Sequence, residues 1–351
     1  LAIGREISHS RDMSEYFRPL VQTGPVRPDT AVTLAGGVCW FSHVECLDRN
    51  RPSKVISASA VPGPWLQSFG APRQPIAGLA FDAPVLMGIL NVTPDSFSDG
   101  GCYDNQQAAL TRAQQMVAQG ANILDIGGES TRPGALEVDV DIEIDRIAPV
   151  IEAVRRWQSV PISIDTRKSA VATAAKTAGA NLVNDVSGFT FDPSLAALCR
   201  DLHLPVIVMH AQGVPQTMQA APHYDNVVLD VYDFLKNQID ELVALGLPRG
   251  QIIADPGIGF GKTLSHNVEL LNGLSVFHGL GVPLMLGASR KGFIRAIGQP
   301  EDANDRMPGS LAVGLAALAQ GVQILRVHDV AATRQAVNLW QAVVYGEHIG
   351  T

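Results

Sequence analysis

Short apolar segments recur along the second part of the chain, and each is followed by polar turn residues and then by a stretch with helical periodicity. The apolar segments are continuous rather than alternating, which is typical of parallel strands that helices cover. Eight such segments occur, at residues 85–91, 122–127, 161–165, 182–185, 205–210, 252–255, 283–287 and 324–328.

Helical stretches between these segments include residues 106–119, 169–178, 226–245 and 310–319. A glycine follows each of them within two residues, as is common where a helix ends in a left-handed residue. Eight β/α units in roughly 260 residues predict a (β/α)8 TIM barrel. A doubly wound sheet gives the same local alternation and stays the alternative, but the count of eight and the lack of a dinucleotide fingerprint after the first strand favour the barrel.

Residues 1–80 have a different composition. Proline and glycine are frequent there, as in 62–64, and no long helical period is present. Short apolar runs at 31–34 and 38–41 predict strands of a small, β-rich unit. We therefore divide the chain into an N-terminal extension of unknown role, 1–80, and a barrel, 81–351.

Composition narrows the classes of function. The net charge is -8 and the pI is near 5.6, which argues against nucleic-acid binding. No apolar run approaches the roughly 20 residues that span a bilayer, so we expect no membrane association. Four cysteines among 351 residues do not form a disulfide framework, and no secretory signal opens the chain, so we expect a cytoplasmic protein.

Polar residues follow nearly every predicted strand, at the end where TIM barrels carry their chemistry. Taken singly, such a residue is more often a helix cap, a turn former or a core histidine. Taken singly, Lys262 and Arg167 are likewise more often ordinary rim charges. The joint pattern indicates a binding site, formed by Asn91, Asp125, Asp165, Asn184, Met209, His210, Asp255, Ser289, Lys291, Arg326 and His328.

The residue types indicate what this site binds. A positive group of donors, made by Arg132, Lys291, Arg326 and His328, suits phosphate or pyrophosphate. The neutral oxygen of Asn91 suits Mg²⁺.

A second group of residues suits a ring. Asp165, Asn184 and Asp255 supply acceptors and an amide deep in the barrel. They match a flat heterocycle that carries adjacent N–H and NH2 donors, such as a 2-amino-pyrimidinone.

Two long motifs make the chain resemble the dihydropteroate synthase family. Residues 88–101 read GILNVTPDSFSDGG and residues 120–134 read GANILDIGGESTRPG, and both resemble signatures of that family. Asp255-Pro-Gly, Ser289-Arg-Lys291 and Arg326-Val-His328 then follow in the family's order. The resemblance covers residues 84–346, about three quarters of the chain.

The resemblance implies an enzyme that condenses 6-hydroxymethyl-7,8-dihydropterin pyrophosphate with para-aminobenzoate, giving 7,8-dihydropteroate and pyrophosphate with the help of Mg²⁺. It also implies a homodimer. The implied pterin-binding residues are Asp165, Asn184, Met209, Asp255 and Lys291.

The resemblance assigns the remaining residues as well. Asn91, Arg326 and His328 would hold pyrophosphate with Mg²⁺. Asp99 would stabilise a cation that forms on the pterin methylene, and Lys291, Arg326 and His328 would also act in catalysis. The arylamine would be enclosed by Phe97, Asp99, Thr131, Arg132, Pro133 and Phe260.

The 80 residues before the first strand depart from the family's usual length. Two other interpretations stay open. One is a methyltetrahydrofolate:corrinoid methyltransferase module, which shares the barrel and the heterocycle site but receives no pyrophosphate. The other is an inactive paralogue.

Overall fold

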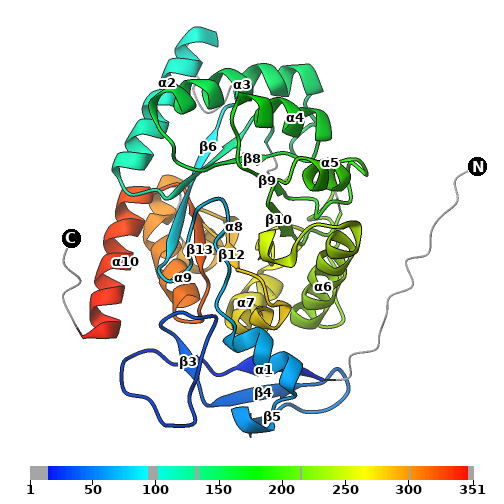
Figure 1. The fold of residues 1–351 in the computed structure, drawn as a ribbon, viewed down its shortest axis with the longest axis vertical. Helices are drawn as coiled ribbons and strands as arrows, with labels where there is room; N and C mark the ends of the chain where they lie inside the picture. Colours follow the sequence, from blue (N-terminus) through cyan, green and yellow to red (C-terminus); the bar gives the residue numbers. More distant parts are fainter. Residues whose placement is uncertain (1–14, 94–101, 131–133, 214–215, 300–301, 347–351) are drawn as a thin grey trace, which may run out of the picture.

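The computed structural model describes residues 15–93, 102–130, 134–213, 216–299 and 302–346 (Figure 1). Eight parallel strands form one sheet in the order β11-β10-β9-β8-β7-β6-β13-β12. A parallel bridge between Ala254 and Leu284 joins the two ends of that order, so the predicted TIM barrel is confirmed. The strands are β6 (Val85–Asn91), β7 (Ile123–Gly127), β8 (Ile162–Asp165), β9 (Leu182–Asp185), β10 (Val206–Met209), β11 (Ile252–Asp255), β12 (Met285–Leu286) and β13 (Ile324–Val327).

Helices surround the barrel, and the predicted ones are present. The predicted stretch 169–178 forms a helix with the same bounds, ended by Gly179 at φ 117°. Asn226 caps another helix by accepting a hydrogen bond from the backbone N–H of Leu229 at 3.1 Å. The helices are α2 (Cys102–Ala118), α3 (Val140–Trp157), α4 (Ser169–Ala178), α5 (Leu195–Asp201), α6 (Val227–Leu245), α7 (Leu264–Asn272), α8 (Gly292–Gly298), α9 (Met307–Leu318) and α10 (Val330–Tyr345). None of the helices in the described ranges is long and apolar enough to span a membrane.

The inside of the barrel is closed at one end by apolar side chains. Ile76 and Phe81, which precede β6, join Val85, Met87 and Ile324 in a buried cluster with residues from other strands. Ile76 is fully buried although it lies within the predicted extension. The barrel is therefore filled at the N-terminal ends of its strands, which leaves the C-terminal ends for a site.

The N-terminal extension has its own small core. Strands β1 (Tyr16–Pro19), β4 (His43–Leu47) and β5 (Lys54–Ser57) form an antiparallel sheet. The two predicted apolar runs form the pair β2 (Val32–Thr33) and β3 (Trp40–Phe41). The structure adds a helix, α1 (Gly63–Gly70), that the Pro62-Gly63-Pro64 sequence did not indicate; a proline in the first turn of a helix costs little. The division at residue 80 stays a prediction.

Aromatic side chains attach the extension to the barrel near α6 and α7, beside the blue elements of Figure 1. The ring of Trp65 stacks on that of Tyr232 in α6, with centroids 5.5 Å apart. Tyr16 meets Tyr232 edge-on at 5.6 Å. The Ser275 hydroxyl, in the 3-10 helix η4 (Leu274–Leu280), donates a hydrogen bond to the Pro19 carbonyl at 2.9 Å.

Ile76 offers a test of the closed end of the barrel. We expect Ile76→Ala to lower the free energy of unfolding by about 2–5 kcal/mol, because it leaves a cavity in a filled interior. Urea unfolding measures the change, with Val26→Ala as the control, since Val26 is 87% exposed and its truncation should cost less than about 0.5 kcal/mol. Equal unfolding midpoints for the two variants would contradict this packing.

Candidate active site

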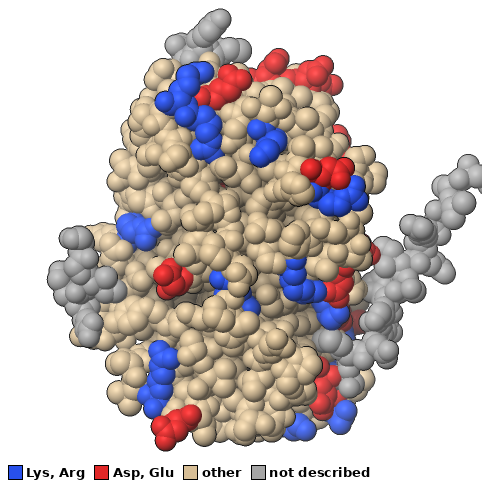
Figure 2. Space-filling model, viewed as in Figure 1, with Lys and Arg blue, Asp and Glu red and all other residues tan. Residues whose placement is uncertain are grey.

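A cavity of about 800 Å³ opens at the C-terminal ends of the strands. Its lining includes predicted site residues from five strands or the loops after them: Asn91, Asp165, Phe260, Lys291, Arg326 and His328. Asn184, Met209 and Asp255 are buried at neighbouring strand ends. On the face drawn in Figure 2, the acidic and basic side chains of the described residues are scattered and form no continuous basic patch.

Arg326 lies at the centre of the buried charges. Its Nε donates to Asp125 Oδ2 at 2.6 Å, and its Nη2 donates to Asp165 Oδ2 at 2.8 Å. Burial alone lowers the pKa of Arg326, but the two carboxylates raise it above the usual value. The guanidinium is therefore charged and fixed between β7 and β8.

Two acceptors beside this cluster are buried and have no hydrogen-bond partner among the described residues: Asp165 Oδ1 and Asn184 Oδ1. The Asn184 amide nitrogen donates to Asp125 Oδ2 at 3.2 Å, so its oxygen faces away from that contact. Burial raises the pKa of Asp165 to about 7, although Arg326 acts in the opposite direction. Unpaired buried acceptors cost free energy unless a ligand donates to them.

Asp255 and Lys291 form a second pair of opposite charges at the site, and each shifts the pKa of the other. Burial raises the pKa of Asp255, while Lys291 lowers it. Burial lowers the pKa of Lys291 to about 8, against the effect of Asp255. The Lys291 ammonium donates to the Ile258 carbonyl and lies 4.4 Å from the centre of the Phe260 ring. These groups place a cation and an aromatic ring on one wall.

The two loops that form this wall, after β11 and after β12, each contain a residue with a positive φ. Gly257 has a φ of 69°, and a Cβ there would lie 1.9 Å from the His210 carbonyl oxygen. Arg290, directly before Lys291, has a φ of 58°, which an L residue rarely adopts. The Asp329 carboxylate accepts a hydrogen bond from Arg290 Nε at 2.9 Å and so supports this conformation.

Comparison with known proteins agrees with this geometry. A family model described as pterin binding enzyme matches residues 87–328. The dihydropteroate synthase of Haemophilus influenzae is 45% identical over 264 residues, which cover 75% of this chain and 95% of that protein. The enzyme of Escherichia coli is 44% identical over 261 residues, which cover 74% and 92%.

The chain belongs to the dihydropteroate synthase family. Solved structures support the same relationship. Dihydropteroate synthase from Xanthomonas albilineans with 4-aminobenzoic acid has a TM-score of 0.73 and 44% identity, covering 78% of this chain and 98% of that one. The same enzyme in complex with 7,8-dihydropteroate has a TM-score of 0.71 and 42% identity, with the same coverage.

One interpretation from the sequence is wrong, and two contacts within the site were not predicted. Lys262 and Arg167 are not rim charges, because they are only 3% and 6% exposed. The Lys262 ammonium contacts His210 Nδ1 at 2.8 Å and donates to the Gly257 carbonyl at 2.9 Å, so it holds the loop after β11 in shape. Asp125 follows a strand in the sequence, but nothing there indicates that it binds Arg326.

Two further predicted residues, His328 and Asn91, lie at the cavity. The ring of His328 contacts the Ser289 hydroxyl at 3.1 Å, a contact across 39 residues that the sequence does not indicate. Asn91 ends β6 at the cavity. The predictions for Phe97, Asp99, Thr131, Arg132 and Pro133 lie outside the described residues.

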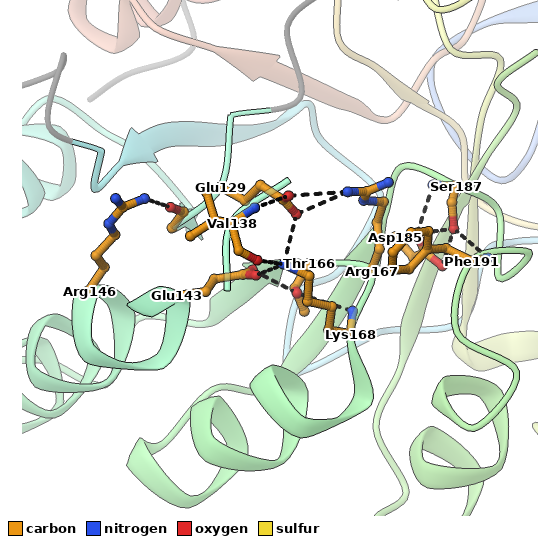
Figure 3. Close-up of polar contacts among 11 residues, drawn as sticks. Glu129, Val138, Glu143, Arg146, Thr166, Arg167, Lys168, Asp185, Ser187 and Phe191 are labelled. Atoms are coloured by element: carbon orange, nitrogen blue, oxygen red, sulfur yellow. Dashed lines mark hydrogen bonds and ion pairs between the residues drawn. The ribbon is translucent and has the colours of Figure 1, made fainter. Parts of the chain in front are cut away.

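Glu129 of the family's second motif belongs to a buried charge network beside the site (Figure 3). Glu129 accepts hydrogen bonds from Arg167 at 3.2 Å and from the backbone N–H of Val138 at 3.0 Å. Lys168 lies 3.4 Å from Glu129 and donates to Glu143 at 2.8 Å. One carboxylate therefore holds together the two ends of the segment from Glu129 to Val138.

The raised pKa of Asp165 predicts a pH effect on stability. The folded-state pKa of about 7 exceeds the usual 3.8, so the folded chain holds an extra proton between these values. The associated stability is present below about pH 4 and is lost as the pH rises through about 7. Asp165→Asn keeps the neutral form at every pH, so the stability of the unsubstituted protein relative to this variant should fall across that window. Urea unfolding at a series of pH values measures this difference, and a constant difference would contradict the shift.

Proposed function

We propose that this protein is a transferase of folate biosynthesis that condenses 6-hydroxymethyl-7,8-dihydropterin pyrophosphate with para-aminobenzoate to 7,8-dihydropteroate and pyrophosphate. The observation that carries the proposal is the pair of buried, unpartnered acceptors, Asp165 Oδ1 and Asn184 Oδ1, next to a cavity with cations at its wall. A pterin ring supplies adjacent N–H and NH2 donors to such acceptors. Relatives named dihydropteroate synthase, at 43–45% identity, support the same reaction.

The pterin ring would take the deep part of the site. Asp165, Asn184 and Asp255 would accept hydrogen bonds from its edge, and Lys291 would donate to its acceptors. Met209, 3% exposed at the end of β10, would contact the ring face. Since every one of these groups is fixed by a strand end or a helix cap, the ring would bind in one orientation.

The pyrophosphate would lie nearer the mouth, where Arg326 and His328 line the cavity. Cationic donors stabilise the negative charge that grows on the leaving group as the C–O bond breaks. Lys291, with a pKa of about 8, is mostly protonated at neutral pH and would contribute to the same effect.

Mg²⁺, which the family resemblance implies, fits the residues present at Asn91. The described residues contain no group of three or more His, Cys, Asp or Glu side chains that could hold a metal by themselves. Mg²⁺ prefers oxygen ligands and usually keeps waters and substrate phosphates in its coordination shell, so one neutral oxygen beside a pyrophosphate suits it. When bound, it would neutralise charge on the leaving pyrophosphate.

The reaction breaks the bond between the pterin methylene carbon and the pyrophosphate oxygen and forms a bond from that carbon to the arylamine nitrogen, which then loses a proton. The arylamine is neutral at pH 7, so the site needs no strong base. Positive charge that develops on the methylene would be shared with the ring and stabilised by Asp99. Phe260 would contact the arylamine ring, and Phe97, Thr131, Arg132 and Pro133 are assigned to the same side from the family motifs.

We also propose that the protein forms a homodimer. Leu339 and Val343 lie one turn apart on α10 and are 63% and 81% exposed. Adjacent apolar side chains on an exposed helix face support an interface with a second copy.

Pyrophosphate release tests the reaction directly. We expect the purified protein, given the pterin pyrophosphate and Mg²⁺, to release pyrophosphate and form dihydropteroate only when para-aminobenzoate is present. Release measured with and without the arylamine separates turnover from hydrolysis. Tight pterin binding without any turnover would contradict the proposal and favour the binding-module or inactive-paralogue interpretation.

Asp165→Asn tests the ring contacts. The substitution replaces one oxygen of a buried carboxyl group with an NH2 group, which cannot accept a hydrogen bond from a ring donor, so pterin affinity should fall by about ten- to a hundredfold. Isothermal titration calorimetry measures the affinity, with Asp201→Asn as the control because the Asp201 side chain is 62% exposed on α5. An unchanged affinity for Asp165→Asn would remove this residue from the pterin site.

A further inference from the structure

Arg49 connects the N-terminal extension to the barrel through a fork of two charged hydrogen bonds. It lies in the turn between β4 and β5, before the first residue that the family model matches. Its two terminal nitrogens donate to Asp230 Oδ1 at 2.6 Å and to Asp233 Oδ2 at 2.7 Å, both on α6. The three side chains are 27–29% exposed, so solvent screens the fork only in part.

The other oxygen of Asp230 holds the chain that leads into α6. Asp230 Oδ2 accepts hydrogen bonds from the backbone N–H groups of Asp225 at 3.0 Å and Asn226 at 3.1 Å. One carboxylate therefore connects Arg49 with the end of segment 216–226. Asp233 differs in this respect, since its carboxylate accepts hydrogen bonds from Arg49 and from the hydroxyl of Tyr16 in β1.

Segment 216–226 reaches the cavity and supports the wall that carries Phe260. Met218 and Gln219 line the cavity. The Gln219 amide donates to the Gly259 carbonyl at 2.7 Å, and the Tyr224 hydroxyl donates to the Gly261 carbonyl at 2.7 Å. The two carbonyls flank Phe260, so the segment contacts the wall immediately before and after this ring.

The N-terminal extension has a buried core of its own and contacts α6 at sites other than Arg49. Its own core buries Phe41 and Phe69 completely. The stack of Trp65 on Tyr232 and the edge contact of Tyr16 attach that core to α6 independently of Arg49. Loss of the Arg49 fork should therefore leave the extension attached while it releases Asp230.

We propose that Arg49 of the N-terminal extension is a positioning residue for the arylamine side of the site: through Asp230 it holds segment 216–226, which in turn holds the Phe260 wall. The inference rests on the proposed function, in which Phe260 contacts the arylamine. Most of the proposed pterin contacts, Asp165, Asn184, Met209 and Asp255, lie at the ends of strands β8 to β11, whereas segment 216–226 contacts the loop after β11. Lys291 is the pterin contact that shares the wall with Phe260.

Steady-state kinetics with Arg49→Met, which keeps the apolar stem, tests the proposal. We expect the KM for para-aminobenzoate to rise roughly fivefold, the size of effect that a partly exposed charge pair produces, with kcat and the KM for the pterin within about twofold. Arg49→Lys should restore part of the loss.

Two control variants separate positioning from simple attachment. Arg51→Ala, in the same turn, removes a side chain that is 67% exposed and pairs with Asp48, so it should change neither KM. Asp233→Asn removes the other half of the fork, which does not reach segment 216–226. If Arg49 only attaches the extension, Asp233→Asn and Arg49→Met will raise the arylamine KM equally, and that result would overturn the proposal. So would an unchanged KM in Arg49→Met.

Hydrogen–deuterium exchange gives a readout that does not depend on turnover. The backbone amides of segment 216–226 should exchange faster in Arg49→Met than in the unsubstituted protein, Arg51→Ala or Asp233→Asn. Equal exchange in all four proteins would overturn the proposal. Failure of the proposed function would appear separately, as absence of turnover in the unsubstituted protein, and the exchange comparison would still decide the role of Arg49.

Discussion

The buried pairing of Arg326 with Asp125 and Asp165 is the interaction on which the site depends. Removing these ions from water costs several kcal/mol each, and only close, well-oriented partners offset that cost. The contacts of 2.6 and 2.8 Å supply such partners, and the strand register of β13, β7 and β8 fixes all three groups. As a consequence one oxygen of Asp165 is left unpaired, together with that of Asn184, and both are oriented before any ligand arrives.

Buried polar side chains also hold the segments around the cavity. Glu129 joins the two ends of the segment after β7 to Arg167 and Lys168. Lys262 fixes the loop after β11 through carbonyl oxygens and His210. The barrel thus supplies a rigid inner group of residues, and these two outer segments are attached to it by hydrogen bonds of buried side chains.

The sequence predicted the barrel because its strands are continuous apolar runs that end in polar residues. The same rule selected Asp165, Asp255 and Arg326, and the structure brings them together. It did not reveal that Asp125 pairs with Arg326, a partner 201 residues away, because spacing along the chain does not encode contacts across a barrel. The sequence favours a rim position for Lys262 because lysines are seldom buried, and its burial depends on backbone carbonyls that spacing along the chain does not indicate. Helix α1 was not predicted because the Pro62-Gly63-Pro64 sequence at its start is typical of a loop.

The central claim is that the deep acceptors are already arranged for a pterin edge. A crystal structure with the dihydropterin pyrophosphate bound tests this most directly. The account predicts ring donors within about 3.2 Å of Asp165 Oδ1 and Asn184 Oδ1, with Arg326 still paired to Asp125. A ring bound elsewhere in the cavity, with both oxygens still unpartnered, would contradict it.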